Sequence, residues 1–164
     1  MASHDFGKPE VCEWIRANFP EESTILDVGA CDGKMKSLLP EYANMDAVEI
    51  WKPNADRLTG YRKVICKDIE EFKYRRYDLI IFGDVIEHME VEKAQKVLEY
   101  AKPRCKEIIV AVPYLYPQDE LYGNPYEKHL QPDLTAKIFN ERYPGFEVLL
   151  DTGRNYCFYR KATK

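Results

Sequence analysis

The sequence predicts an α/β fold: a doubly wound sheet of seven strands, mostly parallel, that ends in an antiparallel hairpin. Five short apolar segments alternate with helical segments along most of the chain, which is typical of parallel strands joined by helices. The last two apolar segments are separated by Thr152-Gly153-Arg154, a spacer that indicates a hairpin turn. The 164 residues, 45% hydrophobic and 32% charged, are expected to form one globular domain over residues 1–164.

The N-terminal half is expected to contain the first helix and three strands. Pro9 can begin a helix, and Val11, Trp14, Ile15 and Phe19 recur at spacings of three and four, so we place an N-terminal helix within residues 1–20. The elements that follow are expected to be a strand at 25–28, a helix at 34–39, a strand at 46–50, a helix at 53–58 and a strand at 64–66.

The C-terminal half is expected to contain the most buried strand and the longest helix. Residues 77–83 read YDLIIFG, an apolar run typical of a strand that is covered on both faces. Residues 90–101 place Val91, Ala94, Val97 and Leu98 on one helical face, and Pro103 ends the pattern. The remaining elements are expected to be a strand at 107–112, a helix at 134–141, and hairpin strands at 146–151 and 155–160.

Composition limits the partners and the compartment. The formal net charge of -4 provides no global positive field for a polyanion, so we expect no nucleic-acid partner and interpret the basic run at 73–76 as solvated surface. The five cysteines include no CxxC pair, and their odd number leaves at least one unpaired, which fits a reducing compartment. We see no signal peptide and no run of the ~20 apolar residues that span a bilayer, so we expect a cytoplasmic protein without a membrane partner.

The segment ILDVGACDG, residues 25–33, is predicted to bind a ligand. It is an apolar strand that enters a glycine turn and then a helix, and ligands of doubly wound sheets bind where such strands end. Gly29 and Gly33 permit a tight turn and a close approach of the backbone to a ligand. Glu49, about twenty residues further on, ends the next strand, where a carboxylate can accept hydrogen bonds from both hydroxyls of a ribose. Together these residues indicate a nucleoside ligand.

The charge of this turn favours a cationic nucleoside. A dinucleotide site requires GxGxxG, so that a pyrophosphate can bind at the helix N-terminus. Here the turn contains Asp32 instead, which would repel a pyrophosphate. Asp27 and Asp32 would tolerate the ammonium and sulfonium charges of S-adenosylmethionine.

Four motifs in order resemble those of the class I S-adenosylmethionine-dependent methyltransferase family, in its small-molecule branch. ILDVGACDG resembles the glycine-rich first motif and VEI, residues 48–50, resembles the acidic second motif. CKDI, residues 66–69, lies where the family keeps an adenine-binding Asp, and FGDVIEHM, residues 82–89, resembles the fourth motif. The resemblance covers most of the chain from residue 25 onward. It implies a Rossmann-like methyltransferase fold and S-adenosylmethionine as the cofactor.

The resemblance also implies roles for individual residues. Glu49 would hold the ribose hydroxyls, and Asp68 with the Ile69 amide would meet the adenine. The cofactor-binding set implied in this way is Asp27, Gly29, Ala30, Cys31, Gly33, Glu49, Ile50, Asp68, Ile69, Gly83, Asp84 and Val85. Cys31 departs from the family, which usually has glycine there. We interpret Cys31 as a small apolar residue with a negative φ and not as a reactive thiol.

Two histidines and four tyrosines are candidates for the reaction itself. His88, at the end of the fourth motif, and His129 are candidate general bases, because imidazole can take a proton near neutral pH. In related enzymes the segment after the fifth strand builds the acceptor pocket, so residues 113–133 are predicted to be an acceptor loop. Its candidate substrate-binding residues, whose rings can stack on a planar or cationic acceptor, are Tyr114, Tyr116, Tyr122 and Tyr126. No metal ligand is predicted.

The sequence therefore predicts a methyltransferase that moves the methyl group of S-adenosylmethionine to an oxygen or nitrogen of a small-molecule acceptor by direct in-line displacement. Two alternatives stay open. One is a non-catalytic nucleoside-binding regulatory module in which Cys31 marks a decayed pocket. The other, a nicotinamide-dependent oxidoreductase, is disfavoured by the absence of GxGxxG. Monomer and homodimer are both compatible with the sequence.

Overall fold

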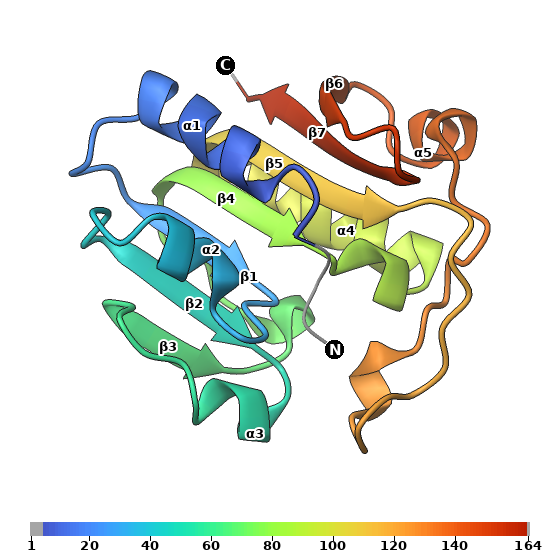
Figure 1. Cartoon of the computed structure of the whole chain (residues 1–164), viewed down its shortest axis with the longest axis horizontal. Helices are drawn as coiled ribbons and strands as arrows, with labels where there is room; N and C mark the ends of the chain where they lie inside the picture. Colours follow the sequence, from blue (N-terminus) through green and yellow to red (C-terminus); the bar gives the residue numbers. More distant parts are fainter. Residues whose placement is uncertain (1–4, 164) are drawn as a thin grey trace.

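A seven-stranded sheet forms the centre of the computed structural model, which describes residues 5–163 (Figure 1). Residues 1–4 of the predicted N-terminal segment and residue 164 lie outside the described residues. The strands are β1 Ile25–Val28, β2 Met45–Glu49, β3 Lys63–Cys66, β4 Tyr77–Gly83, β5 Cys105–Pro113, β6 Glu147–Asp151 and β7 Tyr156–Ala162. Their order is β3-β2-β1-β4-β5-β7-β6. The first five are parallel and β7 is antiparallel to both β5 and β6, which confirms the predicted fold class.

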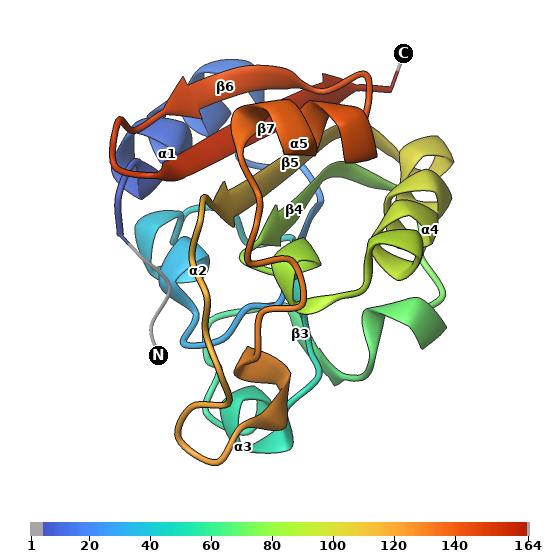
Figure 2. The same cartoon turned by 90° about the vertical axis from the view of Figure 1, so that its right-hand side faces the viewer.

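Helices cover both faces of this sheet, with α1 and α2 on one face and α4 and α5 on the other (Figures 1 and 2). The α-helices are α1 Lys8–Asn18, α2 Lys34–Leu38, α3 Lys52–Ala55, α4 Val91–Ala101 and α5 Ala136–Arg142. Single 3-10 turns occur at η1 Ile69–Glu71, η2 Ile86–His88, η3 Lys102–Arg104 and η4 Pro125–Glu127. None of the helices within residues 5–163 is long and apolar enough to span a bilayer.

Strand β4 shows how one apolar run serves two cores. Leu79 and Ile81 belong to the buried cluster that contains side chains of α1 and α2. Ile80 and Phe82 belong to the cluster that contains side chains of α4 and α5. Successive side chains of a strand point to opposite faces of the sheet, so a strand covered on both faces needs apolar residues at every position. All four of these side chains are 2% exposed or less.

The helices near two loops differ from their predicted bounds. The helix expected at 134–141 begins at Ala136, because the Thr135 side chain caps it by accepting a hydrogen bond from the Ile138 amide at 3.2 Å. Leu134, ahead of the cap, is fully buried. The helix expected at 53–58 ends at Ala55.

The strand order also locates the ligand site. From β1 the chain proceeds outward to β2 and β3, and then returns to the other side of β1 to form β4 and β5. The order therefore reverses between β1 and β4, and ligands of open α/β sheets bind at the carboxyl ends of the strands at such a point.

Candidate cofactor and active site

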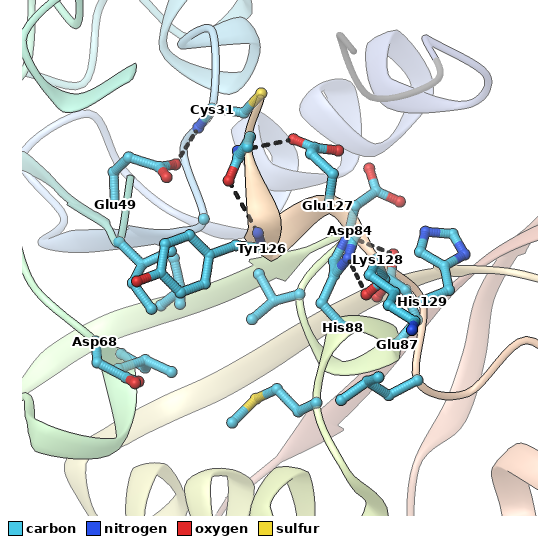
Figure 3. A pocket seen from close by; sticks show the side chains of 18 of the residues that line it. Cys31, Glu49, Asp68, Asp84, Glu87, His88, Tyr126, Glu127, Lys128 and His129 are labelled. Atoms are coloured by element: carbon cyan, nitrogen blue, oxygen red, sulfur yellow. Dashed lines mark hydrogen bonds and ion pairs between the residues drawn. The ribbon is translucent and has the colours of Figure 1, made fainter. Parts of the chain in front are cut away.

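A cavity of about 410 Å³ lies at this point, within the size range of ligand pockets (Figure 3). Its walls come from the turns after β1, β2 and β4, from η1, and from the loop after β5. Nine of the residues predicted for the cofactor line it: Gly29, Cys31, Glu49, Ile50, Asp68, Ile69, Gly83, Asp84 and Val85. The other three, Asp27, Ala30 and Gly33, are not among the lining residues.

Glu49 connects two of these turns. Its carboxylate, on a residue that is 5% exposed, accepts a hydrogen bond from the Cys31 amide at Oε2 and another from the Trp51 amide at Oε1, each at 2.9 Å. Burial raises the pKa of Glu49, and the two amides oppose that shift. Each carboxylate oxygen has a second acceptor site, so Glu49 can still accept hydrogen bonds from a ligand.

Gly29 is required by the packing of the protein itself. Its φ is 69°, and a Cβ atom there would lie 2.5 Å from Cγ2 of Val85. Gly83, at the end of β4, differs: a Cβ there would meet no atom of residues 5–163 within 4 Å. Of these two glycines, Gly83 is thus the one that leaves space open in the cavity wall.

Cys31 adopts a φ of 51°, so the expected negative φ is wrong. Cys31 is the second residue of a four-residue turn, which the Gly33 amide closes by donating to the Ala30 carbonyl at 2.7 Å, and a positive φ at that position occurs in turns of types I′ and II′. Burial raises the pKa of the Cys31 thiol to about 12, which keeps it protonated at neutral pH. This protonation state agrees with the interpretation that Cys31 is not a nucleophile.

Asp27 is 2% exposed, and its Oδ2 accepts a hydrogen bond from the Tyr61 hydroxyl at 2.6 Å. Burial raises the pKa of Asp27 to about 7. Asp68, in contrast, lines the cavity and caps η1, where its Oδ1 accepts from the Glu70 amide at 2.9 Å. The acids of the predicted cofactor-binding set thus separate into one, Asp27, that is buried with Tyr61 and three that line the cavity, Glu49, Asp68 and Asp84.

At the other end of the cavity, the chain after β4 meets the loop after β5. The carbonyl of Glu87, in η2, accepts hydrogen bonds from the Leu130 and Gln131 amides at 2.8 and 3.0 Å. The Gln131 side chain donates to the carbonyls of Ile86 and Met89 at 2.8 and 3.0 Å. These bonds fix the loop against η2 and bring His129 beside His88, with ring centroids 4.7 Å apart.

Both histidines are oriented by backbone carbonyls. Nδ1 of His88 lies 3.1 Å from the Lys128 carbonyl oxygen, and Nδ1 of His129 lies 2.6 Å from that of Tyr116. Burial, followed by the neighbouring His129, lowers the pKa of His88 to about 4, so the ring is neutral at pH 7. Burial and the charge of Asp84 raise the pKa of Glu87, which is 1% exposed.

Of the four predicted substrate-binding tyrosines, Tyr116 and Tyr126 line the cavity. The Tyr114 hydroxyl instead hydrogen-bonds with that of Tyr159. Tyr122 is 78% exposed at the tip of the loop. Neither Tyr114 nor Tyr122 is among the residues that line the cavity.

The prediction omitted several lining residues, among them Glu87 and Glu127. Glu87 did carry a signal, because it precedes His88 directly after a buried strand. For Glu127 the sequence offered no signal other than its position within an irregular loop. Its carboxylate contacts the side-chain amides of Gln118 and Asn124, each at 3.4 Å, and these are contacts within the folded loop.

Comparisons with known proteins bear on the fold. No protein-family model matches the chain, and no curated protein matches its sequence. An S-adenosylmethionine-dependent methyltransferase from Clostridium acetobutylicum superposes with a TM-score of 0.71 at 14% identity, over 97% of this chain and 92% of that one. The plantazolicin methyltransferase BpumL, bound to S-adenosylhomocysteine, superposes with a TM-score of 0.70 at 12% identity, over 97% of this chain and 83% of that one.

Magnesium protoporphyrin IX methyltransferase from Synechocystis PCC 6803, solved with bound S-adenosylmethionine, gives a TM-score of 0.66 at 12% identity, over 93% of this chain and 76% of that one. Likeness at this level of identity establishes architecture. The chain therefore has the fold of the class I S-adenosylmethionine-dependent methyltransferases.

Proposed function

We propose that the chain is an S-adenosylmethionine-dependent methyltransferase that acts on an oxygen or nitrogen of a small-molecule acceptor by in-line displacement. One observation supports this most directly: Glu49 lies at the end of β2, held by the amides of Cys31 and Trp51, in the wall of the switch-point cavity. The structurally similar proteins named above are methyltransferases, and two of them were solved with S-adenosylmethionine or S-adenosylhomocysteine bound.

The residues of the cavity fit this cofactor. Among residues 5–163, seven acidic side chains and three lysines line the cavity, a balance that favours a ligand with ammonium and sulfonium charges. In the proposed mode, Glu49 binds the ribose, Asp68 and Ile69 bind the adenine, and the chain beside Gly83 accommodates the methionine portion. This last assignment is supported by the space beside Gly83, where a Cβ would meet no atom of the described residues within 4 Å.

When bound, S-adenosylmethionine supplies an electrophilic methyl group on a positively charged sulfur. The protein contributes mainly by holding the acceptor in line, and good orientation of two reactants can offset roughly 7–11 kcal/mol of a barrier. We propose that residues 113–133 form the acceptor loop of a single domain, with Tyr116 and Tyr126 as its aromatic contacts.

Either histidine is a possible proton acceptor. The Nδ1 contacts to carbonyl oxygens imply that Nδ1 carries the proton, which leaves a lone pair on each Nε2. His88 is a weak base because burial lowers its pKa. Direct proton transfer to His88 therefore suits an acidic acceptor, such as a phenol, better than an alcohol.

Calorimetry with S-adenosylhomocysteine, followed by transfer of a labelled methyl group to a panel of phenols, alcohols and amines, tests the proposal. We expect one bound molecule per chain and at least one labelled product. Failure of the folded protein to bind S-adenosylhomocysteine would refute the proposal. Binding without transfer to any member of the panel would favour the regulatory module instead.

A further inference from the structure

We propose that Glu87, His88 and His129 form a divalent-cation site at the acceptor end of the cavity, with Asp84 as a neighbouring carboxylate. The sequence predicted no metal ligand, and it is the folding of the loop against η2 that brings these side chains together (Figure 3). The site would take a first-row transition ion such as Mn²⁺, Co²⁺ or Zn²⁺. The metal-binding inference is independent of the proposed function, whereas its consequence for catalysis rests on it.

The distances suit one shared ion. One ligand atom from each of Glu87, His88 and His129 lies within 4.8 Å of the other two, and Oε1 of Glu87 is 3.9 Å from Nε2 of His88. Two ligand atoms bound to one tetrahedral ion at about 2.1 Å are about 3.4 Å apart. Each pair must therefore approach by at most about 1.4 Å, the difference between 4.8 and 3.4 Å, a distance that rotation of the side chains can supply.

The histidines are oriented as metal ligands usually are. A ligating imidazole commonly donates its second N–H to a carbonyl or carboxylate, which sets the tautomer and the direction of the ring. His88 and His129 both place Nδ1 against a backbone carbonyl oxygen, at 3.1 and 2.6 Å. In this tautomer Nε2 is the ring atom whose lone pair can bind an ion. The two rings come from segments that are distant in sequence, so their common orientation supports a common ligand.

Glu87 lacks a positive partner. Its carboxylate is buried, and both oxygens lack a well-formed hydrogen bond from residues 5–163. Among the described ion pairs, the one involving Glu87 is with His88, and the groups that act on the carboxylate include its own backbone amide and the neighbouring Asp84. Burying two neighbouring carboxylates without a cation is costly. A divalent cation would supply the missing charge and would relieve the repulsion between Glu87 and Asp84.

The ligand set indicates the class of ion. Imidazole nitrogens suit transition ions, whereas Mg²⁺ and Ca²⁺ prefer sites made of oxygen atoms. Two imidazoles with one carboxylate should therefore bind Mn²⁺, Co²⁺ or Zn²⁺ more tightly than Mg²⁺. With three ligands from the protein, the ion would retain a position for a water molecule or a ligand from the cavity.

If the proposed function holds, this position would select an oxygen acceptor. An acceptor hydroxyl bound to the cation loses its proton to water more readily, because the cation stabilises the resulting alkoxide or phenoxide. The oxygen lone pair then forms the bond to the methyl carbon. The bond from carbon to sulfur breaks with its electron pair on sulfur, which leaves a neutral thioether. In this arrangement the histidines hold the ion, and neither needs to accept the proton.

The test uses the full chain without a polyhistidine tag, stripped of metal by a chelator. Co²⁺ titration followed by visible absorption, and Zn²⁺ titration by calorimetry, should each show one ion per chain, with little competition from a tenfold excess of Mg²⁺. His129→Ala and Glu87→Gln should weaken binding at least 100-fold. Asp68→Asn removes a carboxylate at the far end of the same cavity and should change the affinity less than threefold (Figure 3).

Thermal unfolding identifies any variant that fails to fold, and His88→Ala provides a second imidazole deletion. The inference is wrong if the wild type binds neither ion, or if folded His129→Ala and His88→Ala bind as tightly as wild type. Parallel calorimetry with S-adenosylhomocysteine separates the two proposals. If the protein binds S-adenosylhomocysteine but neither metal ion, the cation site is refuted and the proposed function stands. If it binds a metal ion but not S-adenosylhomocysteine, the proposed function is refuted and the cation site stands.

Discussion

Replacing Cys31 with glycine should stabilise the protein. Cys31 has a φ of 51°, in the left-handed region that costs a residue with a side chain roughly 1–2 kcal/mol. Glycine adopts this region freely, but it loses about 0.5–1 kcal/mol more conformational entropy on folding than alanine does. The net effect of Cys31→Gly is therefore an increase in the free energy of unfolding of about 0.5–1 kcal/mol. For a chain of this size that corresponds to a rise in Tm of about 1–4 °C.

Cys31→Ala is the matched control. Alanine removes the thiol but keeps the Cβ atom, so the left-handed strain remains and no gain in Tm is expected. The Cys31 amide, which donates to Glu49 at 2.9 Å, belongs to the backbone and is present in both variants. We therefore expect Cys31→Gly to bind S-adenosylhomocysteine at least as tightly as wild type. This result would also remove the argument that Cys31 marks a decayed pocket.

Thermal and urea unfolding of the three proteins, with calorimetry of S-adenosylhomocysteine binding, provide the assay. The strain argument is refuted if Cys31→Gly is less stable than wild type. It is equally refuted if Cys31→Ala gains as much as Cys31→Gly, because the thiol and not the backbone would then be the source of the effect.

Two further predictions concern the acids of the first two strands. Glu49→Gln leaves one side-chain oxygen for two backbone amides and removes an ionised acceptor. Because hydrogen bonds to charged groups contribute about 1.5–3 kcal/mol, calorimetry should show that the affinity for S-adenosylhomocysteine falls about 10- to 100-fold. An unchanged affinity would contradict the role of Glu49. Burial raises the pKa of Asp27 from 3.8 to about 7, so the folded protein holds a proton on Asp27 more tightly than the unfolded chain does. The stability that this protonation contributes is complete below pH 4 and is lost as the pH rises through 7. Asp27→Asn should therefore gain stability over wild type in urea unfolding as the pH rises from 4 to 8, by up to about 4 kcal/mol, whereas a difference independent of pH would exclude this explanation.

Local patterns of sequence were sufficient to predict the architecture. The apolar run of β4 and the one-sided pattern of α4 reflect burial on two faces and on one face, and both elements lie where the periodicity predicted them. The glycine turn after β1 and Glu49 at the end of β2 are likewise local, because each lies at the carboxyl end of a strand and these ends must share one edge of a parallel sheet. Helix bounds were less predictable where a single cap decides them, as Thr135 does for α5.

Contacts between distant segments decided the rest. The pairing of Asp27 with Tyr61, 34 residues away in the sequence, removes that acid from the cavity wall. Nothing in the spacing of His88 and His129 indicates that their rings meet. They meet because the amides of Leu130 and Gln131 bond to the carbonyl of Glu87. Periodicity reports which face of an element is buried, and for this reason the sequence by itself determined the sheet and its switch point. The partners of a loop depend on where the remainder of the chain lies. Only the tertiary structure therefore assembled the proposed cation site.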